Sequence, residues 1–118
     1  MIDLRNELYA VPEYEWRHVP ITVSRHKWQL RWYRGDDGEF FFAFDSPKQR
    51  RYSCFVERDG GRGGRGRVTD ASVITARGYS IASYRDVWGD APQRMDAVIR
   101  LTPKHILDKL SMLLDAVG

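Results

Sequence analysis

The residues best suited to chemistry in this sequence are arginines, and they are concentrated in the middle of the chain. Residues 47–67 contain seven Lys or Arg residues and two acidic ones, whereas the segments on either side are nearly neutral or acidic. Arginine presents a planar fork of donors that matches phosphate or carboxylate and also stacks on rings. We therefore predict that the partner is phosphate-rich, meaning a nucleic acid, or is an acidic protein surface. The predicted contacts are Lys48, Arg50, Arg51, Arg58, Arg62, Arg65 and Arg67, with Tyr52 as a stacking residue.

A glycine-rich stretch lies inside this basic segment, and residues 61–66 spell the pattern G-x-G-x-x-G. In a dinucleotide-binding domain this pattern opens a helix within a parallel β-α-β unit, yet here hairpin-like strands precede it. The Walker pattern also fails, because Arg67-Val68 stands where Lys-Ser/Thr is required. We therefore do not interpret this stretch as a nucleotide-binding loop.

The same stretch predicts an exposed loop over residues 60–67, because glycine brings no side chain to pack. Arginines on such a loop can follow a phosphate backbone, with an affinity that falls as the salt concentration rises. The alternative interpretation is a solvated hairpin tip whose charge protects a sheet edge.

Aromatic side chains offer a second surface on which bases could stack, but core packing explains most of them. Trp28, Trp32 and the run Phe40–Phe44 are predicted to lie in the core. The roles of Tyr33 and Tyr52 stay open.

Catalytic and metal-binding sets are sparse. His18, His26 and His105 are scattered along the chain, and no two are spaced as zinc ligands on one helix are, so the sequence predicts no metal site. Cys54 lies in an apolar run, where a small buried residue explains it better than a nucleophile does. We therefore expect no catalytic activity, no metal and no cofactor.

Alternation of apolar and polar residues predicts the elements that position these side chains. Residues 26–33 and 40–44 are predicted to be strands joined by a turn at 35–38, and residues 52–56 add a third strand. A short strand is expected at 21–23 after Pro20, and residues 2–9 predict a short helix that Pro12 ends. Periodicity does not decide between strand and helix at 68–76 and 79–88.

The C-terminal part predicts a buried strand at 97–101 followed by a helix. Thr102 and Pro103 are typical of a helix N-cap and first helical residue. The apolar residues of that helix share one face, and they are Ile106, Leu107, Leu110, Leu113, Leu114 and Val117. The 118 residues thus predict a single α+β domain: an antiparallel β-meander sheet packed by a C-terminal amphipathic helix, with a short N-terminal helix.

Composition limits the class of protein further. The chain has a net charge of +3, with 42% hydrophobic and 30% charged residues, which is typical of a soluble globular protein. No apolar run approaches the length needed to cross a bilayer, so we expect no membrane association. The single cysteine fits a reducing compartment, and we expect a cytoplasmic location.

Our leading hypothesis is a small basic, non-enzymatic module that binds a nucleic acid or an acidic partner through its arginines. One alternative is a subunit of a larger assembly, such as a virion component or a small inhibitor of a complex that handles nucleic acid. The second alternative is a small enzyme whose catalytic residues come together from distant positions.

Overall fold

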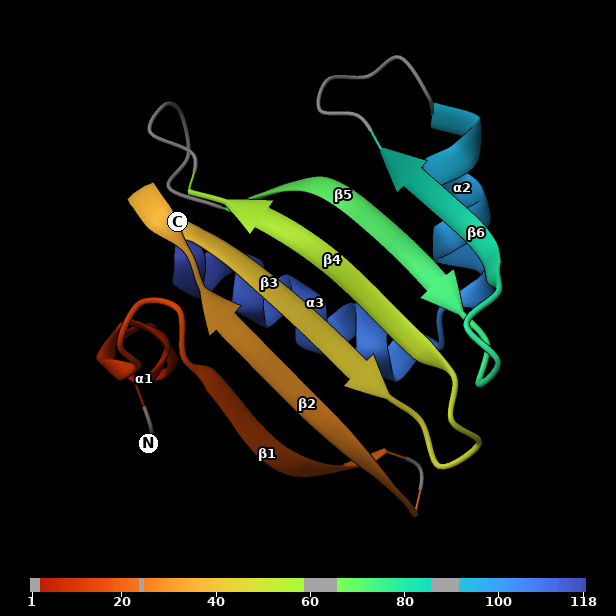
Figure 1. Cartoon of the computed structure of the whole chain (residues 1–118), viewed down its shortest axis with the longest axis horizontal. Helices are drawn as coiled ribbons and strands as arrows, with labels where there is room; N and C mark the ends of the chain where they lie inside the picture. The colour runs from red at the N-terminus through yellow and green to blue at the C-terminus, as the bar shows by residue number, and fades with distance from the viewer. Residues whose placement is uncertain (1–2, 24, 59–65, 86–91) are drawn as a thin grey trace.

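The computed structural model describes residues 3–23, 25–58, 66–85 and 92–118. It contains a six-stranded antiparallel sheet, three α-helices and a short 3-10 helix (Figure 1). In chain order the elements are α1 (Leu4–Ala10), β1 (Trp16–Val23), β2 (His26–Arg34), η1 (Asp36–Gly38), β3 (Glu39–Asp45), β4 (Arg51–Glu57), β5 (Arg67–Ile74), β6 (Ser80–Arg85), α2 (Pro92–Leu101) and α3 (Lys104–Val117).

The six strands follow one another across the sheet in the order β1-β2-β3-β4-β5-β6, and each strand is antiparallel to the next. This confirms the predicted β-meander and the predicted hairpin around residues 35–38. In such a sheet alternate turns fall at the same end. The turns β1–β2, β3–β4 and β5–β6 therefore lie along one side of the molecule. The β2–β3 connection, the end of β4 and the start of β5 lie along the other (Figure 1).

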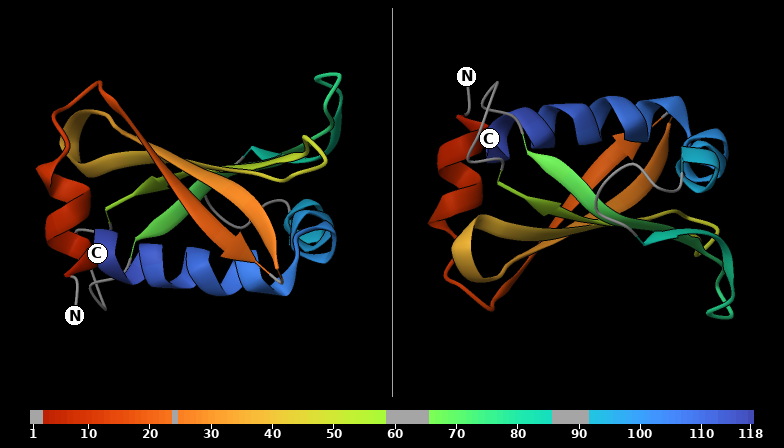
Figure 2. Two further views of the ribbon diagram at one scale, coloured as in Figure 1. Left: turned by 90° about the horizontal axis from the view of Figure 1, so that it is seen from below. Right: turned by 90° about the horizontal axis from the view of Figure 1, so that it is seen from above.

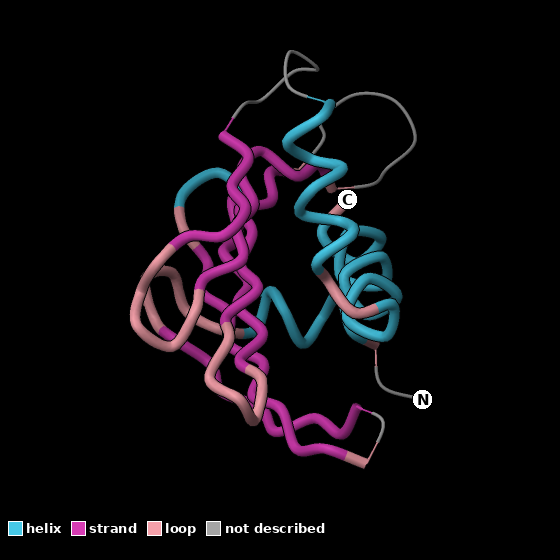
Figure 3. Tube along the Cα trace, turned by 90° about the vertical axis from the view of Figure 1, so that its right-hand side faces the viewer, coloured by secondary structure: helices cyan, strands magenta, loops and turns pink. Residues whose placement is uncertain are grey.

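The helices and the sheet form two layers (Figures 2 and 3). Helix α3 crosses one face of the sheet, which we call the inner face, while α1 and α2 flank its ends. The core lies between the layers, where Phe40, Phe42 and Phe44 are at most 2% exposed and pack with Ile106 and Leu113 of α3. Each such side chain contributes about 1.5–3 kcal/mol when it is fully buried. The C-terminal amphipathic helix and its apolar stripe are thereby confirmed.

Helix α1 closes one end of the core. Its first residue is Leu4, because the carboxylate of Asp3 accepts the backbone N–H groups of Arg5 and Asn6. Leu8 is fully buried, and the hydroxyl of Tyr9 donates to the carbonyl of Val117 at 3.0 Å. The N-terminal helix thus binds directly to the last turn of α3.

The predicted strand at 97–101 is wrong, because these residues form the second half of α2. A short apolar run cannot distinguish a buried strand from one side of a helix. Here Val98 is buried, whereas Ile99 and Leu101 are 44% and 40% exposed, as expected for a helix that packs through one side. Thr102 does not cap α3 either. Its hydroxyl donates to the carbonyl of Val98 at 2.6 Å at the end of α2, and Pro103 occupies the N-cap of α3.

Three other predictions are refined. The undecided segments 68–76 and 79–88 contain strands β5 and β6. Strand β1 begins at Trp16, well before Pro20, and a proline is tolerated there because β1 is an edge strand. Most of the loop expected over residues 60–67 lies outside the described residues. At its end, however, Gly66 is buried and Arg67 already belongs to β5.

Within the described residues, no helix is long and apolar enough to cross a membrane.

Candidate phosphate-binding site

The predicted arginine-rich segment is divided between the two ends of the sheet. Lys48, Arg50 and Arg51 precede or begin β4, whereas Arg58 follows β4 and Arg67 begins β5 at the opposite end. The intervening strand separates the two groups by about 20 Å, since a strand rises about 3.4 Å per residue. The predicted contacts Arg62 and Arg65 lie outside the described residues.

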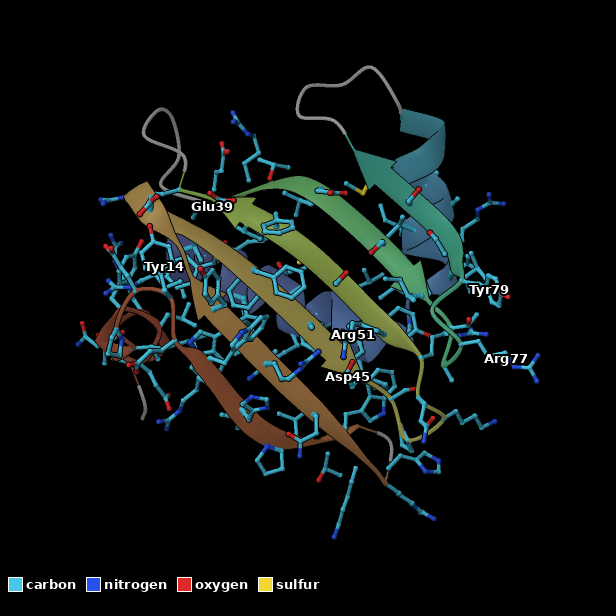
Figure 4. The ribbon with its side chains drawn as sticks, viewed as in Figure 1. Tyr14, Glu39, Asp45, Arg51, Arg77 and Tyr79 are labelled. Atoms are coloured by element: carbon cyan, nitrogen blue, oxygen red, sulfur yellow. The ribbon has the colours of Figure 1, made fainter. Side chains whose placement is uncertain are left out.

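One end of the sheet instead collects basic residues from three separate turns, and we call it the basic end. It combines the turns β1–β2, β3–β4 and β5–β6 with the strand ends beside them (Figures 1 and 4). Its basic residues are Arg25, His26, Lys27, Lys48, Arg50, Arg51 and Arg77. Among the described residues of these turns and strand ends, Asp45 is the acidic one.

Asp45 is occupied by two arginines on the side of the sheet away from α3. The Arg51 Nε donates to Asp45 Oδ1 at 2.7 Å, and the Arg31 Nε lies 3.1 Å from Oδ2 (Figure 4 labels Asp45 and Arg51). Within the described part of the chain, no carboxylate pairs with Lys48 or Arg50. These two cations are therefore available to an external anion.

Lys48 and Arg50 line a pocket of about 490 Å³ at the basic end. The complete lining is His26, Trp28, Ser46, Pro47, Lys48, Arg50, Tyr52, Thr75 and Ala76. Three of the residues predicted from the sequence, Lys48, Arg50 and Tyr52, thus lie in one cavity. Its size lies in the range of ordinary small-molecule sites.

Two rings form the buried side of this pocket. The rings of Trp28 and Tyr52 lie 5.7 Å apart between centroids and are inclined by 31°. Trp28 is 8% exposed and Tyr52 is 7% exposed, so both belong to the core as well as to the pocket wall. Trp28 was predicted to be a core residue, and this is confirmed. The stacking role of Tyr52 stays a prediction. Because the side chain is mostly buried, only the part of its ring that lines the pocket could contact a base.

The β3–β4 turn holds the two cations through its own hydrogen bonds. The Ser46 N–H donates to the carbonyl of Arg50 at 2.9 Å, and the Arg50 N–H donates to the Ser46 hydroxyl at 3.0 Å. The Gln49 N–H donates to the carbonyl of Ser46 at 2.9 Å, and Gln49 adopts a φ of 60°. A turn tied in this way presents Lys48 and Arg50 from a defined backbone rather than from a loose loop.

The pocket combines the groups that recognise a phosphorylated planar ligand. Ammonium and guanidinium groups bind phosphate by charge and by hydrogen bonds, and hydroxyl groups such as those of Ser46 and Thr75 add neutral donors. Aromatic rings supply a surface against which a base can stack. No group of three or more metal-ligating side chains occurs among the described residues.

Cys54 lies away from this pocket, under the helices. It is 4% exposed, which confirms the prediction of a small buried residue. Burial, and secondarily the negative charge of Asp70, raises the pKa of its thiol to about 12. Because the thiolate is the nucleophilic form, this thiol is held in its unreactive state at neutral pH.

Sequence reasoning missed His26 and Thr75 as neighbours of Lys48 and Arg50 in the pocket, and Arg77 as a residue of the same end of the sheet. The order of the predicted strands contained the information needed to find them. Once consecutive antiparallel hairpins are predicted, alternate turns must share an end, and the residues near 25, 48 and 77 fall on three such turns.

No family model, no curated protein and no solved structure matches the chain.

Proposed function

We propose that this protein binds nucleic acid, with its basic end on the phosphate backbone. The observation that carries the proposal is the pocket that Lys48 and Arg50, paired with no carboxylate of the described residues, line together with His26 and the rings of Trp28 and Tyr52. Phosphate contacts of this kind supply most of the affinity of nucleic-acid binding that is independent of sequence.

The remaining predicted contacts are expected to contribute unequally to phosphate binding. Arg51 and Arg67 each already pair with a carboxylate, Asp45 and Glu57 respectively, so each gains less from an added phosphate. Arg58 lies at the far end of β4 and would contact a distant part of a long ligand. Arg62 and Arg65 stay predicted contacts from the sequence.

Nucleic acid fits this site better than an acidic protein surface does. Carboxylates on a protein would satisfy the cations but would leave the aromatic side of the pocket without a matching group. A nucleotide carries both parts, because its phosphate suits Lys48 and Arg50 and its base suits a ring wall.

The test is a filter-binding titration at several salt concentrations with the variant Lys48→Ala/Arg50→Ala. Removing two phosphate contacts should weaken binding at least tenfold at low salt and make the slope of log K against log salt shallower by about two. The charge-matched control is Arg5→Ala/Arg17→Ala, which removes two exposed cations from α1 and from the start of β1, at the opposite end of the molecule.

Equal losses in the two double variants would mean that only net charge matters, and would remove the pocket from the proposal. Failure of the unaltered protein to bind single-stranded or double-stranded nucleic acid at low salt would end the proposal altogether.

A further inference from the structure

The face of the sheet opposite α3, which we call the open face, is covered by no helix of the described chain (Figure 2). Directly opposed residues of antiparallel strands share a face, so the strand register defines rows of side chains across it. One row is aromatic on four successive strands. It pairs Trp16 with Tyr33, Tyr33 with Phe41, and Phe41 with Phe55, and we call these four residues the aromatic row.

The rings of the aromatic row contact one another from β1 to β4. Trp16 lies 5.2 Å from Tyr33 and 5.5 Å from Phe41 between ring centroids, and Phe41 lies 4.9 Å from Phe55. Even so, Trp16 remains 47% exposed and Phe55 37% exposed. The row is therefore a continuous ring surface that the described residues leave partly exposed.

The next row toward the basic end consists of small residues. It pairs Ala43 with Ser53, Ser53 with Ser72, and Ser72 with Ser83, and we call it the serine row. The hydroxyls of Ser53 and Ser72 lie 2.8 Å apart and form a hydrogen bond. Ala43 is itself fully buried, whereas Ser53 and Ser72 are partly exposed and Ser83 is exposed. Their hydroxyl groups can bond to sugar or phosphate oxygens.

Two arginines flank these rows on the open face. Arg31 lies at the β2 position of the serine row, opposite Ala43, and its guanidinium carbon is 5.3 Å from the centre of the Trp16 ring. Arg51 and Asp45 form the next row, at the edge of the basic end. Successive rows are about 7 Å apart, because residues two positions along a strand share a face. Along β3 and β4 the side chains of the open face thus change from rings, through small residues, to the Asp45–Arg51 ion pair, and Arg31 adds a guanidinium group beside them.

We propose that the open face binds single-stranded nucleic acid by stacking unpaired bases on the aromatic row, with the sugar–phosphate backbone over the serine row toward the basic end. The inference rests on the proposed function and adds that the ligand is single-stranded. The order of the three rows matches the order of base, sugar and phosphate in a nucleotide. In a duplex the flat sides of the bases are covered by their neighbours and cannot reach the rings, whereas in a single strand they can.

A second copy of the chain fits this face less well. Interface cores are depleted of charged residues, yet Arg31, Asp45 and Arg51 lie on the open face beside the rows that a dimer would bury. Burying such a group costs desolvation energy that the pairing does not reliably return.

The experiment compares three ligands of equal length: a single-stranded oligonucleotide, the same strand without bases, and a duplex. Trp16→Ala and Phe55→Ala should each weaken binding of the ordinary single strand about tenfold. Both variants should leave binding of the abasic strand, and the salt dependence, unchanged. Trp16→Phe keeps a ring and should retain most of the affinity. Met112→Ala is the matched control, because it removes a side chain that is 56% exposed on the helical side.

The outcomes separate this inference from the proposed function. If Trp16→Ala and Phe55→Ala fold, as judged by circular dichroism, and bind the single strand normally while Lys48→Ala/Arg50→Ala does not, stacking is overturned and backbone binding stands. Stronger binding to the duplex than to the single strand also overturns stacking. If light scattering detects a dimer that either ring variant dissociates, the open face is a protein interface. If the unaltered protein binds no nucleic acid, both proposals are overturned.

Discussion

Two arginines that are adjacent in the sequence can lie on opposite faces of the sheet, so that only one of them is available to a ligand at a given site. Arg50 lines the pocket at the basic end, whereas Arg51, the first residue of β4, holds Asp45 on the open face. The cause is the two-residue period of a strand, which sends neighbouring side chains to opposite faces. A count of charges along the chain therefore overestimates how many of them can meet one ligand.

Asp45 pairs with Arg31 and Arg51 and so reduces their attraction for a phosphate group. The variant Asp45→Asn tests this. The substitution removes a negative charge that now occupies Arg31 and Arg51. We expect affinity for single-stranded nucleic acid at low salt to rise about threefold to tenfold, in line with the ~1 kcal/mol of an exposed charge pair. Asp108→Asn makes the same charge change on α3 and should alter the affinity less. No gain for Asp45→Asn relative to this control would contradict the assigned ligand path.

Elements with a clear period could be predicted from the sequence, and elements without one could not. The strands around the 35–38 turn and helix α3 carry unmistakable apolar patterns, and the structure confirms them. Residues 97–101 were misassigned, because the packing of α2 against β5 and β6, rather than any local preference, makes them helical. For the same reason, no local pattern distinguished Gly66 from the glycines before it.

Gly66 is a packing residue where the chain enters β5. Its N–H donates to the carbonyl of Leu114 at 2.7 Å, and a Cβ atom placed on it would lie 2.8 Å from Val56 Cγ1 and 3.1 Å from the Leu114 oxygen. Gly66→Ala should therefore destabilise the protein by about 1–3 kcal/mol, measured as a lower midpoint of urea unfolding. Gly35→Ala is the control, because its nearest neighbours are 3.8 Å away. Equal midpoints for the two variants would show that β5 can shift to accommodate a side chain.

At the scale of the whole molecule, the order of the strands determines which residues meet in the pocket at the basic end. Lys48, Arg50 and Tyr52 could be predicted from the sequence because they are close together in it. Their neighbours His26 and Thr75 could not, because only the order of strands brings them to one pocket. The open-face rows were missed for the same reason, since a row is defined by register between strands and not by spacing along one.

Cys54 reports on the integrity of the whole fold, because it lies in a central strand beneath the helical layer. Its thiol should react with a disulfide reagent only after global unfolding, at a rate that follows the unfolded population. Its pKa is raised from 9.0 to about 12, so between these pH values the unfolded chain binds fewer protons than the folded one. The free energy of unfolding should therefore fall as pH rises from about 9, by up to about 1.4 kcal/mol per unit.

Cys54→Ala isolates this contribution, because the substitution removes this thiol and no other ionisable group. The variant loses some packing energy at neutral pH, but its stability should decline less steeply above pH 9. Parallel stability curves for the two proteins, or rapid labelling of the native thiol, would contradict the burial of Cys54.

The uninterrupted order of the strands also has a consequence for how this protein can change. The chain returns to the basic end after every second strand, so the residues of the basic end are encoded in three short stretches about 25 residues apart. Each stretch belongs to its own hairpin, so its exposed turn residues can be changed while the buried residues beside them, Trp28 and Tyr52, are kept. Substitutions in one turn, or a longer turn, could therefore change the surface of the basic end while the sheet and the core stay the same.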